Sequence, residues 1–173
     1  MPSTRKLKAW PTPRGSRSST RATVGRLLGQ LFPVTGDLHE AEEVVQEAYA
    51  RASTRWARLR DYDVPEAWVR RVAMNLAADR GRRLQRQARA LLRAGPPPHV
   101  PPASVEAMAL AEALRSLPMH QRQAIVLHHL ADLPVEEVAA TLGARTGTVK
   151  SWLARGRKAL AATLGDPEEA LSP

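Results

Sequence analysis

The sequence predicts an all-α protein made of two small helical domains that are joined by a Pro-rich linker, with a helix-turn-helix at the end of the second domain. Apolar residues recur at i, i+3, i+4 and i+7 along most of the chain, which is the spacing of amphipathic helices. No segment of useful length alternates apolar and polar residues, so no sheet is expected. Five prolines stand between residues 95 and 102, where they forbid a helix and predict a stiff spacer.

The composition limits the class of protein. The chain has 173 residues, of which 43% are hydrophobic and 25% charged, and this balance is typical of a soluble globular protein. The absence of cysteine excludes a disulfide framework and a thiolate metal site. No apolar run is long enough to span a membrane, and no apolar stretch follows the basic N-terminus as in a secretory signal. We therefore expect a cytoplasmic protein without membrane insertion.

Charge is distributed unevenly along this basic chain, whose net charge is +9. Residues 1–36 carry seven Lys or Arg and no Asp or Glu, and an acidic group follows between Asp37 and Glu47. Six arginines then occur from Arg80 to Arg93 with no acid between them. Clustered arginines in a basic chain indicate a polyanionic partner such as nucleic acid. Each charged run taken alone is also typical of a solvated helix face.

The first half of the chain is expected to contain a disordered basic arm at residues 1–22 and a helical domain at residues 23–94. A short apolar stripe from Val24 to Leu31 should end at Pro33, because proline has no N–H and interrupts a helix. Two longer stripes follow. They predict one helix from Leu38 to Trp56 and another from Trp68 into the arginine cluster, with a polar loop between them.

The second half follows the expected linker at residues 95–104 and forms a domain at residues 105–165, with a tail at residues 166–173. Breaks at Pro118, Leu133-Pro134 and Gly143 divide this domain into four expected helices. These helices cover residues 105–117, 119–130, 135–142 and 146–164.

Residues 135–154 have the spacing of a helix-turn-helix. Ala139 is small enough for a second helix to cross closely, Gly143 supplies the positive φ at the end of the first helix, and Thr146 is a good N-cap. Val149 would face the core. A recognition helix needs short donors and cations on its other face. That face, which contains no acid, carries Thr148, Lys150, Ser151, Arg155, Arg157 and Lys158. An ordinary αα-hairpin with a glycine turn is the alternative.

Four stretches resemble parts of the extracytoplasmic-function (ECF) sigma factors of the sigma-70 family. Residues 133–160 resemble the region that reads the promoter −35 element, and residues 114–127 resemble the helix pair before it. Residues 35–49 resemble the helix that binds core RNA polymerase. Residues 65–80, with Arg82 and Arg83, resemble the helix that reads and melts the −10 element. The resemblance implies a sigma factor for a subset of promoters, such as stress-responsive ones.

The same resemblance implies partners and site residues. Core RNA polymerase and promoter DNA are the expected partners, an anti-sigma factor is a candidate third, and no small-molecule substrate or cofactor is expected. The residues implied for core-polymerase binding are Asp37, Glu43, Val44, Val45, Gln46 and Glu47, of which Val45 would supply an apolar contact. Those implied for −10 recognition and melting are Tyr62, Trp68, Arg70, Arg71, Asn75, Asp79, Arg80, Arg82 and Arg83, with Asn75 facing the captured base. Those implied for −35 recognition are Arg145, Thr146, Thr148, Lys150, Ser151, Arg155 and Lys158.

Several alternatives stay open at this point. Trp68 is either a stacking wedge or a core residue, and its spacing from Val72 and Leu76 favours the core. The family begins with a helix, and in this chain the basic, proline-containing start predicts either a short helix at about residues 22–32 or an aberrant start of the reading frame. His128 and Asp132 are four residues apart, but a surface pair is more typical than a metal site.

Two other classes of function compete with a sigma factor. A free-standing helix-turn-helix regulator would bind duplex DNA without core polymerase, as a dimer on paired half-sites. A general RNA-binding protein would need aromatic stacking platforms, and the few aromatic residues of this chain lie mostly on apolar stripes. No arrangement of nucleophile and base appears, so we expect no enzyme activity.

Overall fold

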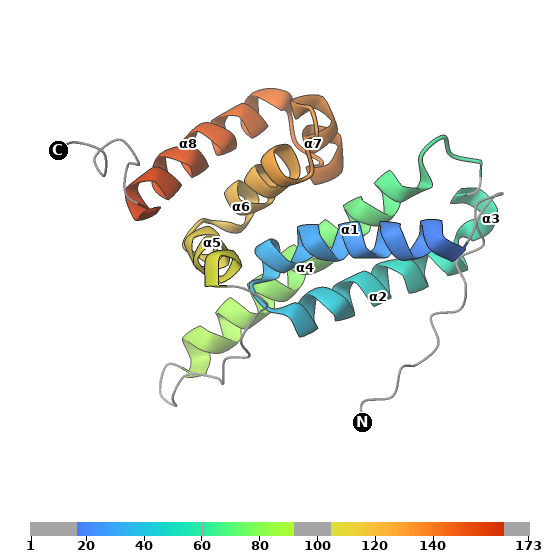
Figure 1. The fold of residues 1–173 in the computed structure, drawn as a ribbon, viewed down its shortest axis with the longest axis horizontal. Coiled ribbons are helices and arrows are strands. Elements are labelled where there is room, and N and C mark those ends of the chain that lie inside the picture. The colour runs from blue at the N-terminus through green and yellow to red at the C-terminus, as the bar shows by residue number, and fades with distance from the viewer. Residues whose placement is uncertain (1–16, 60, 92–104, 165–173) are drawn as a thin grey trace.

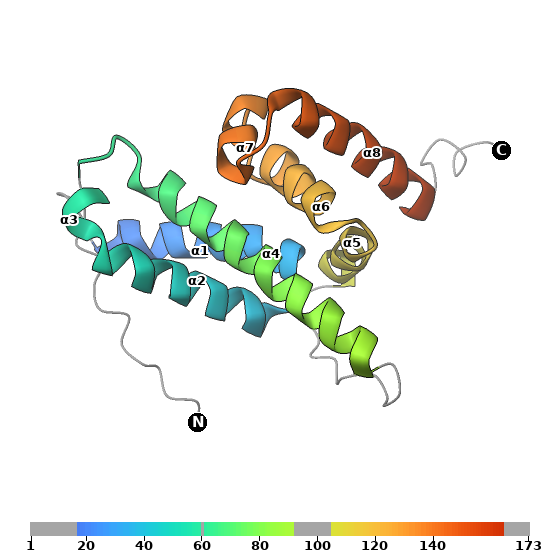
Figure 2. The ribbon, with the colours of Figure 1, turned by 180° about the vertical axis from the view of Figure 1, so that it is seen from behind.

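The first helical unit contains three long helices that lie side by side (Figures 1 and 2). The computed structural model describes residues 17–59, 61–91 and 105–164. The expected linker at residues 95–104 and tail at residues 166–173 lie outside these ranges, as do residues 1–16 of the expected basic arm. The unit consists of α1 (Arg17–Thr35), α2 (Leu38–Thr54), α3 (Trp56–Leu59) and α4 (Pro65–Leu91).

The second helical unit follows the expected division at Pro118, Leu133-Pro134 and Gly143. It consists of α5 (Val105–Arg115), α6 (Met119–Ile125), the π-helix η1 (Val126–Leu130), α7 (Val135–Leu142) and α8 (Thr146–Leu164). Every regular element in the described ranges is a helix. The predicted fold class, all-α with two small helical domains, is therefore confirmed. None of the described helices has the length and apolar content needed to cross a bilayer.

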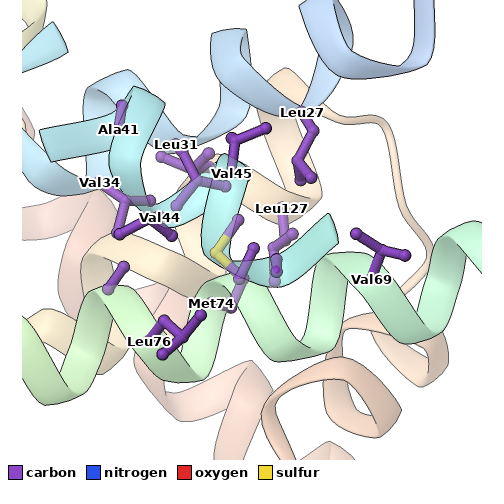
Figure 3. Close-up of a cluster of buried hydrophobic side chains, with 14 of the residues drawn as sticks. Leu27, Leu31, Val34, Ala41, Val44, Val45, Val69, Met74, Leu76 and Leu127 are labelled. Carbon is purple, nitrogen blue, oxygen red and sulfur yellow. The ribbon is translucent and has the colours of Figure 1, made fainter. Parts of the chain in front are cut away.

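The two units share one apolar core (Figure 3). Leu31 of α1, Val44 of α2 and Met74 of α4 are completely buried, and Leu127 of η1 is buried in the same cluster. Burying a side chain of this size stabilises the fold by roughly 1.5–3 kcal/mol. The sequence predicted two halves on a tether and gave no sign of this contact, because an apolar stripe does not say which helix covers it.

The extent of α1 corrects two expectations. The helix begins at Arg17, so residues 17–22 are helical and do not belong to a disordered arm, and it continues through Pro33 to Thr35. Proline in a helix interior costs about 3 kcal/mol, chiefly through the missing N–H and a clash with the preceding turn. Here Pro33 lies in the last turn, where the Gly36 N–H donates to the Phe32 carbonyl at 2.8 Å. The complete burial of Leu31 and Val34 on either side of Pro33 offsets the cost.

The helix-turn-helix has the expected geometry with one correction. Gly143 adopts φ 65° at the end of α7, as the sequence predicted, and its N–H donates to the Ala139 carbonyl. The Arg145 carbonyl accepts hydrogen bonds from Thr148 and Val149 N–H, so Arg145 occupies the N-cap position. Thr146 is the first helical residue of α8 and not its N-cap, because Arg145 takes that position, while the helix itself covers the expected residues 146–164.

Candidate functional sites

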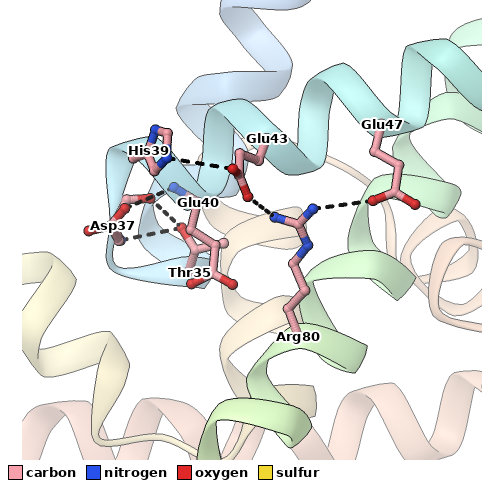
Figure 4. Close-up of polar contacts among 7 residues, drawn as sticks. All are labelled: Thr35, Asp37, His39, Glu40, Glu43, Glu47 and Arg80. Atoms are coloured by element: carbon pink, nitrogen blue, oxygen red, sulfur yellow. Dashed lines mark hydrogen bonds and ion pairs between the residues drawn. The ribbon is translucent and has the colours of Figure 1, made fainter. Parts of the chain in front are cut away.

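The outer face of α2 carries acidic and amide side chains. Glu42, Glu43 and Gln46 are exposed, and Glu47 is half-buried on the side that faces α4. Figure 4 shows Glu43 and Glu47 pointing toward the same region between the two helices. The face presents oxygen acceptors to a partner, which is the chemistry expected of a surface that binds a basic clamp.

Three of the residues implied for polymerase binding have other roles. Val44 is fully buried and Val45 is 3% exposed, so both lie in the core and not on the exposed face of α2. The Asp37 carboxylate caps α2 by accepting a 2.8 Å hydrogen bond from the Glu40 N–H. Leu38 was not among the residues implied for this face, yet it is 48% exposed and is the large apolar side chain that α2 presents to solvent. The spacing of Val44 and Val45 with Ala41 and Ala48 already indicated a buried stripe.

Arg80 of α4 reaches across to the acidic face of α2 (Figure 4). Its Nη1 lies 2.8 Å from Glu43 Oε2, and its Nη2 lies 3.2 Å from Glu47 Oε2. Partial burial alone would raise the pKa of Glu47, but hydrogen bonds from Arg51 and Arg80 outweigh it, and the pKa lies below its usual value. The resemblance implied that Arg80 contacts DNA. In this structure the guanidinium is paired with two carboxylates of α2.

The exposed face of α4 forms a stripe of polar residues. Arg71, Asn75 and Asp79 follow one another at four-residue spacing and are exposed, so they lie on one side of the helix. Arg82 and Arg83 extend the stripe, and Arg82 forms an ion pair with Asp79.

Two aromatic residues near α4 differ in exposure. Tyr62 is exposed in the loop before α4. Trp68 is half-buried against the core, with the Arg55 guanidinium 5.8 Å from its ring centroid, so the core interpretation of Trp68 is confirmed. Tyr62 is therefore the aromatic side chain that this part of the molecule presents to solvent.

Arg70 lies at the contact between the two units. Its Nη2 is 3.6 Å from Glu137 Oε2 of α7, and its Nε is buried without a hydrogen-bond partner. Burial lowers the pKa of Arg70, while the nearby carboxylates of Glu137 and Glu66 act in the opposite direction. In this arrangement α7 covers Arg70, which therefore does not lie on the exposed stripe of α4.

Helix α8 presents its expected polar face to solvent. The Arg155 Nη2 donates a 2.8 Å hydrogen bond to Ser151 Oγ, so these two side chains act as a pair. Val149 is fully buried. Gly156 has no side chain, and this lets α8 pack closely on α6, because a Cβ at this position would lie only 3.0 Å from Ile125 Cγ1. The residues implied for −35 recognition are all exposed: Arg145, Thr146, Thr148, Lys150, Ser151, Arg155 and Lys158.

His128 contacts the backbone just after the end of η1. Its Nδ1 lies 2.7 Å from the Leu133 carbonyl, which accounts for one ring nitrogen. The described residues contain no group of three or more His, Asp or Glu side chains that could hold a metal ion.

The chain matches known proteins in both units. Residues 20–87 match Sigma-70 region 2, and residues 107–160 match Sigma-70 region 4. The ECF RNA polymerase sigma factor SigM of Mycobacterium tuberculosis is 34% identical over 142 residues, which cover 81% of this chain and 72% of SigM. The chain belongs to the ECF sigma factors. The RNA polymerase sigma-E factor of Streptomyces coelicolor is 33% identical over 118 residues, which cover 67% of each chain.

Two solved structures have the same fold. The sigma factor RpoE of Bartonella quintana, solved in complex with the anti-sigma factor NepR, covers 87% of this sigma factor with a TM-score of 0.67 at 22% identity. CnrH, solved in complex with the cytosolic domain of CnrY, covers 90% with a TM-score of 0.57 at 28% identity. As a sigma factor, the chain serves promoter-directed transcription. Its region 2 comprises α1 to α4 and its region 4 comprises α5 to α8.

Proposed function

We propose that this sigma factor binds core RNA polymerase through the exposed face of α2 and directs it to a subset of promoters. The exposed stripe of α4 reads the −10 element, and the exposed face of α8 reads the −35 element. The observation that carries the proposal is the separation of three surfaces on one chain: an acidic one on α2, an asparagine-arginine one on α4 and an acid-free basic one on α8. The protein acts in the cytoplasm as a binding subunit, without a catalytic step of its own.

The docking surface on α2 consists of Leu38, Glu42, Glu43, Gln46 and Glu47. Leu38 supplies an apolar contact, and the carboxylates and the amide supply acceptors for a basic clamp. An acidic surface repels phosphate, so this face suits a protein partner and not DNA.

The α4 surface suits opened DNA. Opening a duplex costs about 1.4 kcal/mol of stacking per base step, and capture of an unstacked base together with cation contacts to the strand offsets this cost. Asn75 stands in the middle of the exposed stripe, where its amide can bond a base edge. Arg71 on one side and Arg83 on the other suit the adjacent phosphates, and Tyr62 offers a ring for stacking.

The α8 surface suits the major groove of duplex DNA. Thr148 and Ser151 are short hydroxyl side chains near the start of the helix, where base edges are closest. Lys150 and Lys158 are long cations that reach phosphates. Because Arg155 is bonded to Ser151, it also fixes the direction of that hydroxyl.

Promoter binding requires regions 2 and 4 to separate. The −10 and −35 elements lie about 25 base pairs apart, which is roughly 85 Å of duplex. In this structure α4 packs directly against α7, and the Glu137 carboxylate pairs with the Arg70 guanidinium. An open form would free Arg70 for DNA and place α4 and α8 on separate promoter elements. An anti-sigma factor, the kind of partner seen with RpoE of Bartonella quintana, is a candidate for controlling this change.

Promoter-specific run-off transcription with purified core polymerase tests the proposed function. Glu43→Lys with Gln46→Lys should abolish co-purification with the core and abolish run-off transcription, while circular dichroism shows an intact fold. Glu112→Lys makes the same kind of charge change on an exposed residue of region 4 and serves as the matched control. Promoter binding by the chain alone, unaffected by core polymerase, would support the free-standing regulator instead.

A further inference from the structure

We propose that Arg80 couples polymerase docking on α2 to DNA capture beside α4. The guanidinium pairs with Glu43 and Glu47 in the free protein. When the polymerase binds those carboxylates, the guanidinium binds a DNA phosphate instead. This inference rests on the proposed functions of α2 and α4 and adds a residue that links the two surfaces.

The geometry places Arg80 under the docking face. The Arg80 side chain is 25% exposed, whereas Glu43 is 52% and Glu47 is 38% exposed, so the carboxylates lie further out than the guanidinium that holds them. Arg80 contacts the Oε2 atoms of both glutamates. The Oε1 atoms face side chains of α2 itself, with His39 Nε2 3.5 Å from Glu43 and Arg51 Nη2 2.6 Å from Glu47. A basic partner therefore competes with Arg80 for carboxylates that it can reach from outside.

Arg80 also lines a basic groove between α2 and α4. The groove has a volume of about 370 Å³ and is lined by five arginines, Arg51, Arg80, Arg82, Arg83 and Arg86, together with Leu76, Glu47 and Asp79. Five cations against two carboxylates make this groove a site for an anion, and its position beside the exposed stripe of α4 places it where the strand of opened DNA would run. Among the groove residues, Arg80 is the one that also forms an ion pair with Glu43.

Competition at the glutamates links the two binding events. When cations of the polymerase pair with Glu43 and Glu47, the Arg80 guanidinium loses its partners and has five N–H donors to offer. A DNA phosphate bound in the groove that Arg80 already lines would then accept hydrogen bonds from it. By thermodynamic linkage, DNA that holds Arg80 must strengthen polymerase binding by the same factor by which polymerase strengthens DNA binding. The free sigma factor would thus keep one of its DNA-binding cations occupied until it is part of the holoenzyme.

The direction in which core-polymerase affinity changes when Arg80 is replaced separates this coupling from a purely structural role of the Arg80 ion pairs. Arg80→Gln removes the internal competitor for Glu43 and Glu47, so the variant should bind core polymerase more tightly. Partly exposed ion pairs are worth about 0.2–1 kcal/mol, so each pair that is removed should raise the affinity by roughly 1.4- to 5-fold. In the holoenzyme the same variant should bind promoter DNA more weakly, and the salt dependence should fall by about one unit of slope.

Two further variants complete the experiment. Arg83→Gln removes the same charge from the same groove, but Arg83 makes no ion pair with Glu43 or Glu47 in the described part of the chain, so core affinity should stay unchanged while DNA affinity falls. Arg80→Lys keeps the charge but replaces the planar fork by a single ammonium group. Its core affinity should lie between those of the wild type and Arg80→Gln, with the salt slope preserved.

Core affinity is measured by titrating labelled sigma factor with core polymerase, and DNA affinity with the assembled holoenzyme. Core binding by Arg80→Gln that is equal to or weaker than wild type would overturn the coupling and leave Arg80 as a tie between α2 and α4. If Arg80→Gln fails to fold, Arg80→Lys replaces it in this test. Core affinity of Arg80→Lys above that of wild type supports the coupling, and equal or lower affinity overturns it. A wild-type chain that does not bind core polymerase would instead overturn the proposed function.

Discussion

The Gln123 side chain donates a 2.7 Å hydrogen bond from Nε2 to the main-chain carbonyl of Met74, and this buried bond joins region 4 to region 2. Arg122 beside it donates from Nη1 to the Val34 carbonyl at 2.7 Å. Burial and the neighbouring Arg115 lower the pKa of Arg122. Polar side chains at this contact suit an interface that opens, because a glutamine and an arginine are readily hydrated once exposed, whereas the apolar residues around them favour closure.

Gln123→Ala should shift the protein toward a form in which regions 2 and 4 are apart. A hydrogen bond of this kind contributes about 1 kcal/mol, which is roughly a five-fold change in the ratio of closed to open molecules. The chain has no cysteine, so cysteines introduced at exposed Ala50 and Ala161 can carry a pair of spin labels or dyes. The distance between the labels should lengthen in Gln123→Ala and stay the same in the control Gln121→Ala. Equal distances in both variants would mean that the Gln123 bond does not hold the units together.

Val45 and Leu38 should respond in opposite ways to truncation. Val45→Ala removes two methyl groups from the core and should lower the free energy of unfolding by about 2 kcal/mol. Leu38→Ala changes an exposed residue, so stability should change by less than about 0.5 kcal/mol. Core-polymerase affinity should nevertheless fall in Leu38→Ala, because the docking face loses its apolar contact. Denaturant unfolding and core titration measure the two effects, and an unchanged core affinity in Leu38→Ala would remove Leu38 from the docking surface.

Ser151 and Arg155 should contribute jointly to −35 recognition. Because Arg155 holds the Ser151 hydroxyl, removing either side chain removes part of the effect of the other. Ser151→Ala, Arg155→Ala and the double variant should therefore be non-additive, with a coupling energy of about 0.5 kcal/mol or more. Holoenzyme affinity for promoters that differ in the upstream element measures this cycle, and Lys158→Ala combined with Ser151→Ala is the control pair, for which additive losses are expected.

Tyr49 should limit stability at alkaline pH. Burial raises the pKa of the Tyr49 phenol to about 12, with a further contribution from Glu66 and an opposing one from Arg26. A raised pKa means that the fold favours the neutral phenol, so the stabilisation is complete below pH 10 and is lost as pH rises toward 12. The full loss corresponds to about 3 kcal/mol.

Tyr49→Phe tests this linkage because it removes the ionisable group and keeps the ring. Denaturant unfolding between pH 8 and pH 12 should show a smaller decline in Tyr49→Phe than in wild type. Parallel declines of the two proteins would show that Tyr49 does not ionise within this range.

The sequence by itself determined the local structure of this sigma factor. Helical spacing of apolar residues identified the longer helices of both units, the need for positive φ placed Gly143 at the end of α7, and the acid-free run after Arg145 marked the exposed face of α8. The same spacing favoured a core position for Trp68, which the structure confirms. These features depend on residues a few positions apart, which a helix brings together whatever surrounds it.

Only the tertiary structure decided which residues serve the surfaces. Arg80 lies 37 residues from Glu43, and its ion pair depends on how α2 and α4 pack, which no local pattern encodes. Val45 was assigned to a partner although its stripe belongs to the core, and α1 continues through Pro33 because burial of Leu31 and Val34 outweighs a local penalty. The contact between regions 2 and 4 has the same origin. Burial is a property of the assembled helices, so the free energy that selects these arrangements appears only when the distant segments meet.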